Sequence, residues 1–153
     1  ALSAGWRDLG WSLGGSAMVR NRPLDGGGDT LDTSLQWSLN PWRWWKSVPI
    51  TYLGEVAYGR LQRPFSGAQT WQLAYFHQLS WTVHSGVILH AGIDFWDPDR
   101  EVVDDDIKRP RAALELIFLP GLTLRTDVRV GVPAGNGSGG QEADVFVQLH
   151  GWF

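Results

Sequence analysis

Residues 69–96 read QTWQLAYFHQLSWTVHSGVILHAGIDFW, and this stretch decides the fold. Apolar and polar side chains alternate along residues 69–83 and again along residues 87–96, which is the period of two that β-strands require. Between them, His84-Ser85-Gly86 is short and ends in glycine, as is typical of a tight hairpin turn. The stretch therefore predicts two antiparallel strands joined by a short turn.

The same period of two continues on both sides of this hairpin. Each alternating stretch has one apolar face and one face of small, polar or charged side chains. Most are near the length that crosses a bilayer when a strand is tilted. The further strands are expected at about 6–20, 33–40, 50–62, 110–119, 122–132 and 143–153. The sequence thus predicts an all-β fold, an antiparallel up-and-down sheet of about eight strands in a single domain over 1–153, or the C-terminal half of a larger barrel.

The connections between strands decide which environment each face meets. Alternation alone does not, because a soluble barrel with an apolar core shows the same period. Loops rich in glycine, proline or charge follow the first, third, fifth and seventh strands, whereas His84-Ser85-Gly86 and Pro120-Gly121 are tight. Only the connection 40–49 is longer than this pattern predicts. Long loops at one end and short turns at the other indicate a transmembrane β-barrel of a bacterial outer membrane, with both termini periplasmic.

Aromatic residues support a membrane location. Tryptophan, ten of 153 residues, favours sites where one ring edge is apolar and the other is wet. At the short-turn end we expect the interface aromatics Trp42, Trp44, Trp45, Trp81, Phe118 and Phe153, and at the long-loop end Trp71, Phe95 and Trp96. Two such groups predict one aromatic girdle for each membrane interface.

The polar faces of the strands carry charges of both signs. Lipid does not accept such groups, whereas the lumen of a barrel allows them to pair. His77 departs from this rule, because it falls on the apolar face near mid-strand, so we expect either a β-bulge there or a neighbouring strand that covers it. The expected lumen network consists of Asp8, Glu55, His90, Asp94, Arg111, Glu115, Arg125, Asp127, Arg129, Asp144 and His150.

The last alternating stretch, 143–153, continues to a terminal phenylalanine. It resembles the strand by which the bacterial barrel-assembly machinery engages its clients, a recognition that works by strand addition. The residues that would carry this assembly signal are Val145, Val147, Leu149 and Phe153.

The second half of the chain resembles the C-terminal region of a poorly characterised family of bacterial outer-membrane barrels. The shared pattern is an aromatic-rich strand (71–81), a short glycine turn, a strand ending in Asp97-Pro98-Asp99, an acidic loop to Asp106, and a terminal strand rich in Phe, Leu and His. The resemblance implies a longer, porin-like protein, with a multihaem cytochrome as a partner. Ser80 and Ile88 stand where the family is more polar, which argues against a wide conducting lumen.

Other chemistry finds little support in the sequence. The acidic loop is a weak candidate for a hard cation, but its spacing is not that of an EF-hand, and a solvated external loop is the preferred interpretation. Its acidic members are Asp97, Asp99, Asp104, Asp105 and Asp106, with Glu101 between them. A net charge of -3 makes no case for nucleic acid, and the absence of cysteine excludes thiolate sites. We expect no cofactor and no enzyme, because a hydrolase needs a serine held by an oriented base, and none is clearly placed.

These observations leave three functions. The first is a small outer-membrane barrel with a largely plugged polar lumen, in contact with membrane lipid and lipopolysaccharide and serving structure, membrane integrity or adhesion. The second is the C-terminal part of a larger porin-like conduit. The third is a soluble ligand-binding β-barrel.

Overall fold

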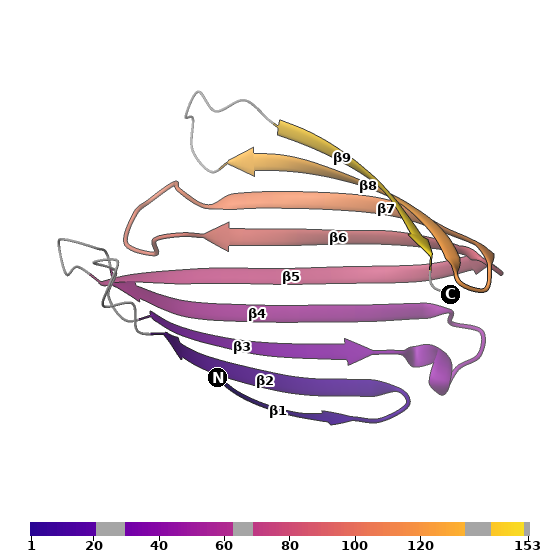
Figure 1. Ribbon diagram of the computed structural model, residues 1–153, viewed down its shortest axis with the longest axis horizontal. Coiled ribbons are helices and arrows are strands. Elements are labelled where there is room, and N and C mark those ends of the chain that lie inside the picture. The colour runs from indigo at the N-terminus through magenta and orange to yellow at the C-terminus, as the bar shows by residue number, and fades with distance from the viewer. Residues whose placement is uncertain (21–29, 63–68, 134–141, 152–153) are drawn as a thin grey trace.

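The chain forms one antiparallel sheet in a computed structural model that describes residues 1–20, 30–62, 69–133 and 142–151. The nine strands follow each other in space in the same order as in the sequence (Figure 1). They are β1 (Leu2–Arg7), β2 (Trp11–Arg20), β3 (Thr30–Leu39), β4 (Ile50–Gln62), β5 (Gln69–His84), β6 (Val87–Asp97), β7 (Ile107–Leu119), β8 (Leu122–Pro133) and β9 (Glu142–Gly151). The expected all-β, up-and-down antiparallel architecture is confirmed.

The prediction of a single strand over residues 6–20 is wrong. The chain reverses at Asp8–Gly10, where the Asp8 carboxylate accepts the Leu9 amide hydrogen at 2.6 Å and the Asp8 amide donates to the Trp11 carbonyl at 2.9 Å. The glycine is needed because Trp44 packs over Gly10, and a Cβ there would lie 2.5 Å from the indole. Asp8 is therefore a turn residue and does not belong to the polar face of a strand.

This extra turn changes where the chain ends lie. Among the nine described strands, β1 and β9 run in the same direction, so the start of β1 and the end of β9 lie towards opposite ends of the sheet, as the arrows in Figure 1 show. The expectation that both termini lie on the same side is therefore wrong. Gly151 pairs with Leu122, beside the short turn at Pro120-Gly121, and so lies at the short-turn end.

The structure of the connection between β3 and β4 explains why this connection is unusually long. It contains the 3-10 helix η2 (Pro41–Arg43), and the Asn40 amide donates to the Gly10 carbonyl at 2.7 Å, so the segment folds back over the β1–β2 turn. The connection is therefore not a tight hairpin turn, and it carries the aromatic residues Trp42, Trp44 and Trp45. No helix among the described residues is long and apolar enough to cross a membrane.

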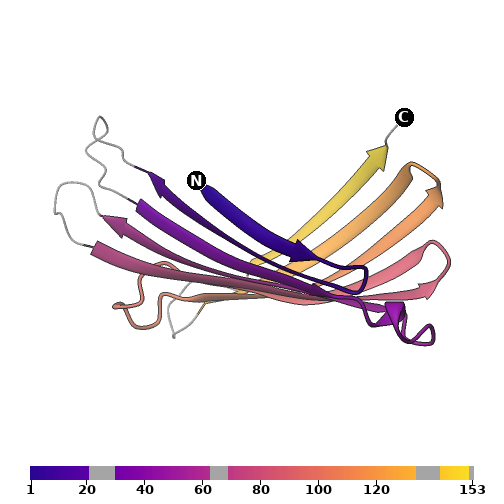
Figure 2. The ribbon, with the colours of Figure 1, turned by 90° about the horizontal axis from the view of Figure 1, so that it is seen from below.

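The sheet is a single curved layer and not a closed barrel. Figure 2 shows a trough whose two walls end in β1 and β9, both bent towards the same face of the sheet. The two strands do not pair with each other among the described residues. Ala113 is the only buried hydrophobic residue of the described part of the chain. The described part of the chain therefore has no hydrophobic core of its own.

The two faces of the trough differ in chemistry. Gln78, Thr123 and Asp127 are buried on the polar face, whereas Leu79 and Trp81, at the middle and end of β5, stay nearly half exposed on the other. Curvature crowds side chains on the inner side of a sheet, so the polar face is the concave one and the apolar face is the convex one.

The tight turns depend on glycine. Gly86 has a φ of 78°, and a Cβ there would lie 2.7 Å from the Ile117 carbonyl oxygen of the neighbouring hairpin. Gly86→Ala should therefore lower the free energy of unfolding by at least about 1–2 kcal/mol, the cost of a side chain in the left-handed region. Denaturant titration followed by circular dichroism measures this. Ser85→Ala is the matched control, and an equal effect of both substitutions would contradict the argument.

Candidate functional site

The concave face carries a cluster of polar side chains over strands β5 to β8. We call it the polar cluster, and it consists of Gln78, Ser80, His90, Asp94, Arg111, Glu115, Arg125, Asp127 and Arg129. The strand register brings it together: Ser80 lies opposite His90, Gly92 opposite Arg111, and Glu115 opposite Arg125. Alternation then points all nine side chains to the same face.

One half of the polar cluster is a directional chain of hydrogen bonds across three strands. Arg111 donates to the Gln78 amide oxygen, and the Gln78 amide nitrogen donates to the Ser80 hydroxyl at 2.9 Å. The Ser80 hydroxyl lies 2.8 Å from Nδ1 of His90, and His90 Nε2 lies 3.1 Å from a Glu115 carboxylate oxygen. Because an ionised carboxylate only accepts, Nε2 is the donor, and in the neutral ring Nδ1 accepts from Ser80.

The hydrogen-bond chain places a serine beside a histidine, contrary to the expectation that no serine is placed beside an oriented base. Ser80 and Glu115 contact the two ring nitrogens of His90, which is the connectivity of a nucleophile, a base and an orienting acid. The Ser80 oxygen also accepts from Gln78, so its bonds tie β5 to β6. Sequence reasoning missed Gln78 and Ser80, although both alternate onto the face that carries His90.

The other half of the polar cluster is centred on Asp127. Its side chain is only 7% exposed and accepts from Arg125 at 3.2 Å and from Arg129 at 3.1 Å. Aromatic rings support the cations: the Arg129 guanidinium lies 5.1 Å from the Phe146 ring centre, and that of Arg111 lies 4.4 Å from Phe76. The expected pairing of Arg125, Asp127 and Arg129 is thus seen in the geometry, whereas both phenylalanines were missed because they are apolar residues on a polar face.

The other residues of the expected lumen network are Glu55, Asp94, Asp144, His150 and Asp8, and of these only Asp94 belongs to the polar cluster. Glu55 and Asp144 are on the same concave face, on β4 and β9, with Asp144 opposite Arg129. His150 lies on β9 with Nε2 3.3 Å from the Gln148 side-chain oxygen. Asp94 is within the cluster, 3.8 Å from Arg111. Asp8 alone is removed from this face.

The acidic loop after β6 is held by its backbone. The Arg100 amide donates to the Trp71 carbonyl at 2.9 Å, and the Asp99 carboxylate accepts the Glu101 amide hydrogen at 3.1 Å. Partial loss of hydration, together with the nearby Asp97 and Asp99 carboxylates, raises the pKa of Asp105. Within the described residues, no three His, Cys, Asp or Glu side chains are arranged to hold a metal ion.

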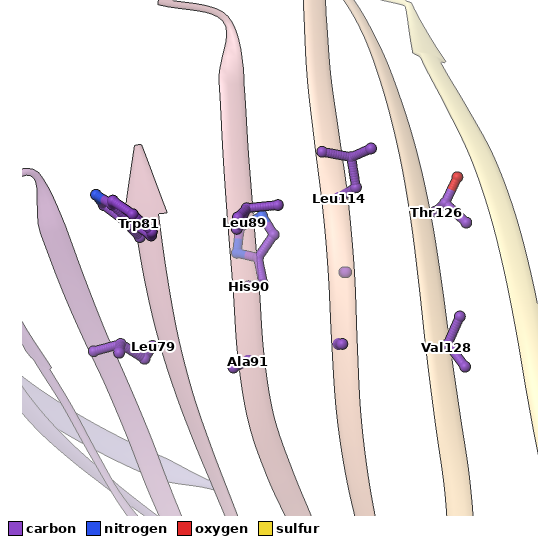
Figure 3. Close-up of a pocket in the computed structure, with 10 residues that line it drawn as sticks. Leu79, Trp81, Leu89, His90, Ala91, Leu114, Thr126 and Val128 are labelled. Atoms are coloured by element: carbon purple, nitrogen blue, oxygen red, sulfur yellow. The ribbon is translucent and has the colours of Figure 1, made fainter. Parts of the chain in front are cut away.

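The convex face carries a shallow apolar hollow of about 630 Å³ over strands β5 to β8. Alanines 91 and 112 contribute to its lining together with larger side chains (Figure 3). The larger side chains are Leu79, Trp81, Leu89, Leu114 and Val128. The ring of His90 lies behind its strand in this view, consistent with its bonds on the concave face (Figure 3). The hollow and the polar cluster thus lie back to back.

His77 lies on the convex face without a bulge, because its neighbours on β5 keep their register with β4 and β6. Tyr52 stacks on its ring at 6.0 Å between centroids, and the tyrosine hydroxyl lies 2.7 Å from Nδ1. Trp37 and Tyr75 contact the same ring at 5.8 and 5.4 Å. Neighbouring strands therefore cover the histidine, which is one of the two expected explanations.

Most of the expected interface aromatics lie near the ends of the strands. Trp42, Trp44 and Trp45 are exposed in the β3–β4 connection, and Trp81 and Phe118 are exposed near the same end of the sheet. At the other end Trp71 stacks on Tyr58 at 5.1 Å, while Phe95 stacks on Tyr75 at 4.6 Å. The expectation that Trp96 belongs with these interface aromatics is corrected. Trp96 directly follows Phe95 on β6 and therefore shares the concave face with Asp94. Phe153 lies outside the described residues.

Removing the central anion tests the polar cluster. Asp127→Asn would leave Arg125 and Arg129 without their shared carboxylate, so we expect the free energy of unfolding to fall by about 2–3 kcal/mol, the value of hydrogen bonds to a charged group. Denaturant titration followed by circular dichroism measures the change. Asp144→Asn, on the exposed strand β9, is the matched control and should cost far less. Equal losses would show that Asp127 has no special place in the network.

No family model matches the chain, and no curated protein sequence matches it. The resemblance of its second half to outer-membrane barrels therefore stays a prediction that depends on the motifs quoted above. Function is inferred from the two faces of the sheet and from the polar cluster.

Proposed function

We propose that this chain is part of the wall of an outer-membrane β-barrel whose concave polar face lines a water-filled passage. The observation that carries the proposal is the single-layer sheet: its described residues form no hydrophobic core, and large apolar side chains remain exposed on its convex face. Soluble monomers rarely expose apolar patches above a few hundred Å², so this face requires an apolar surrounding. A bilayer supplies one.

Strand length and hydrogen bonding support the same proposal. Every strand from β2 to β9 has at least ten residues, and about 9–11 tilted residues cross a bilayer. In lipid each backbone N–H and C=O must be paired within the protein, which a β-barrel achieves between strands. The aromatic residues near the strand ends fit the two interfaces of such a membrane.

The pairing of the charges favours a passage over the plugged lumen that was expected first. Asp127 pairs with Arg125 and Arg129 along β8, and His90 pairs with Glu115 on the adjacent strand. The printed contacts among the described residues of the polar cluster are therefore made within the wall, between residues of one strand or of neighbouring strands, except that Arg111 on β7 reaches over β6 to Gln78 on β5. A plug would need partners from across the lumen. Charges satisfied within the wall leave the interior free for water.

A soluble ligand-binding barrel fits less well. Such a barrel encloses its apolar side chains, whereas here they project from the convex face. Lipid and lipopolysaccharide are the surrounding partners that the membrane proposal implies. Val145, Val147 and Leu149 lie on the exposed strand β9, where assembly machinery could add a strand, and Phe153 lies outside the described residues. A cytochrome partner stays a prediction from the family resemblance.

The two faces are distinguished by adjacent residues on β3. The chain has no native cysteine, so Ser34→Cys and Leu35→Cys each introduce a single thiol. Ser34 bonds Ser16 on the concave face, whereas Leu35 is 49% exposed on the convex face. In native membranes a charged, water-soluble maleimide should label Ser34→Cys and spare Leu35→Cys, and denaturation should expose both. Equal labelling before denaturation would refute a lipid-facing convex surface.

The passage itself is tested by conductance. The native protein purified from membranes should produce discrete current steps in a planar bilayer, because hydrated charges on the concave face permit ions to pass. Arg125→Gln should shift the reversal potential in a salt gradient towards cation preference, and it should cost less stability than Asp127→Asn, because Arg129 still pairs with Asp127. A protein that is folded and inserted but passes no current would instead support the plugged barrel.

A further inference from the structure

The two edges of the sheet, β1 and β9, require partners. Every residue of both strands is exposed, and neither edge pairs with the other among the described residues. Figure 2 shows the two strands on opposite walls of the trough. An edge strand presents a row of unpaired N–H and C=O groups, which lipid does not tolerate. If the convex face is in a membrane, as proposed above, both edges must be paired with further strands.

The directions of the strands determine what those partners are. All eight pairings in the sheet are antiparallel, and nine strands leave β1 and β9 running in the same direction. Closing β9 directly onto β1 would therefore create a parallel pair in an otherwise antiparallel wall. A second copy does not solve this, because rotation about the barrel axis preserves strand direction and again places β9 beside a parallel β1.

We propose that β1 and β9 pair with the two outer strands of a further wall segment that contains an odd number of antiparallel strands and is not a second copy of this sheet. The inference rests on the proposed membrane function. With an odd number added, the total becomes even and both junctions become antiparallel, as single-chain bacterial barrels require. The total also exceeds eight strands, the size at which side chains just fill the interior.

The edge strands indicate the chemistry of that segment. On β9, Val145, Val147 and Leu149 point to the convex side, while Asp144 and Gln148 point to the concave side. The adjoining strand must therefore alternate in register, with apolar residues opposite the valines and polar residues opposite Asp144 and Gln148, because a slip of one residue would reverse its faces.

Disulfide trapping in native membranes tests the proposal on the whole protein. Ser3→Cys, on the concave side of β1, is combined in turn with Asp144→Cys, Phe146→Cys and Gln148→Cys on β9. The matched control is Ser12→Cys with Ser38→Cys, whose hydroxyl oxygens lie 2.7 Å apart on paired strands. Under mild oxidation the control should form a disulfide within one molecule, and none of the β1–β9 pairs should do so.

Hydrogen exchange of the native protein supplies the positive readout. The amides of β1 and β9 should exchange as slowly as those of β4 and β5, because further strands pair with them. Rapid exchange of the amides of either edge strand would overturn the proposal. An intramolecular β1–β9 disulfide would overturn it too, because it would mean closure within this sheet. A disulfide-linked dimer would overturn it as well, because it would mean closure by a second copy. Failure of the membrane function would be seen separately, as equal labelling of Ser34→Cys and Leu35→Cys.

Discussion

The structure depends on one constraint: the described residues form one sheet with no second layer packed over it. A soluble β-protein covers the apolar face of its sheet with another sheet or with helices, and the shared interior supplies most of its stability. Here the described residues form a single layer of nine strands, which keeps its apolar side chains on the outside of the curve. The backbone hydrogen bonds between strands and the side-chain contacts within each face are then the protein's own contribution to its stability. The surroundings must supply the remainder, which is why the fold leads directly to a proposal about location.

The concave face shows how such a wall holds together without an apolar core. The bonds from Arg111 through Gln78, Ser80 and His90 to Glu115 join three consecutive strands. On the next strand Asp127 forms ion pairs with two arginines, one of which also packs on a phenylalanine ring. A polar network of this kind is stable only when every member has a partner. The close pairing of charges within the wall is thus both a structural device and a means of leaving the interior to water.

The convex face follows a different rule, in which aromatic contacts replace polar ones. Trp37 packs over Gly54, where an added Cβ would lie 2.4 Å from the indole, and so reaches across β4 to contact His77 on β5. The histidine is accommodated on an apolar surface because Tyr52 supplies a hydrogen-bond partner and three rings shield it. A polar residue at an apolar position is therefore explained by its neighbours on other strands.

The sequence by itself determined the all-β class, most of the strands, the tight turns at Gly86 and Gly121 and the division into one apolar and one polar face. These are local properties, because the period of two and the turn residues are set by a few consecutive positions. The tertiary structure decided the rest. It split residues 6–20 at a turn that Trp44 covers, placed Trp96 on the concave face, and joined Ser80 to His90. It also made the number of strands odd. Each of these outcomes depends on which residue a neighbouring strand places opposite, and strand register is a property of pairs of segments that no single segment carries.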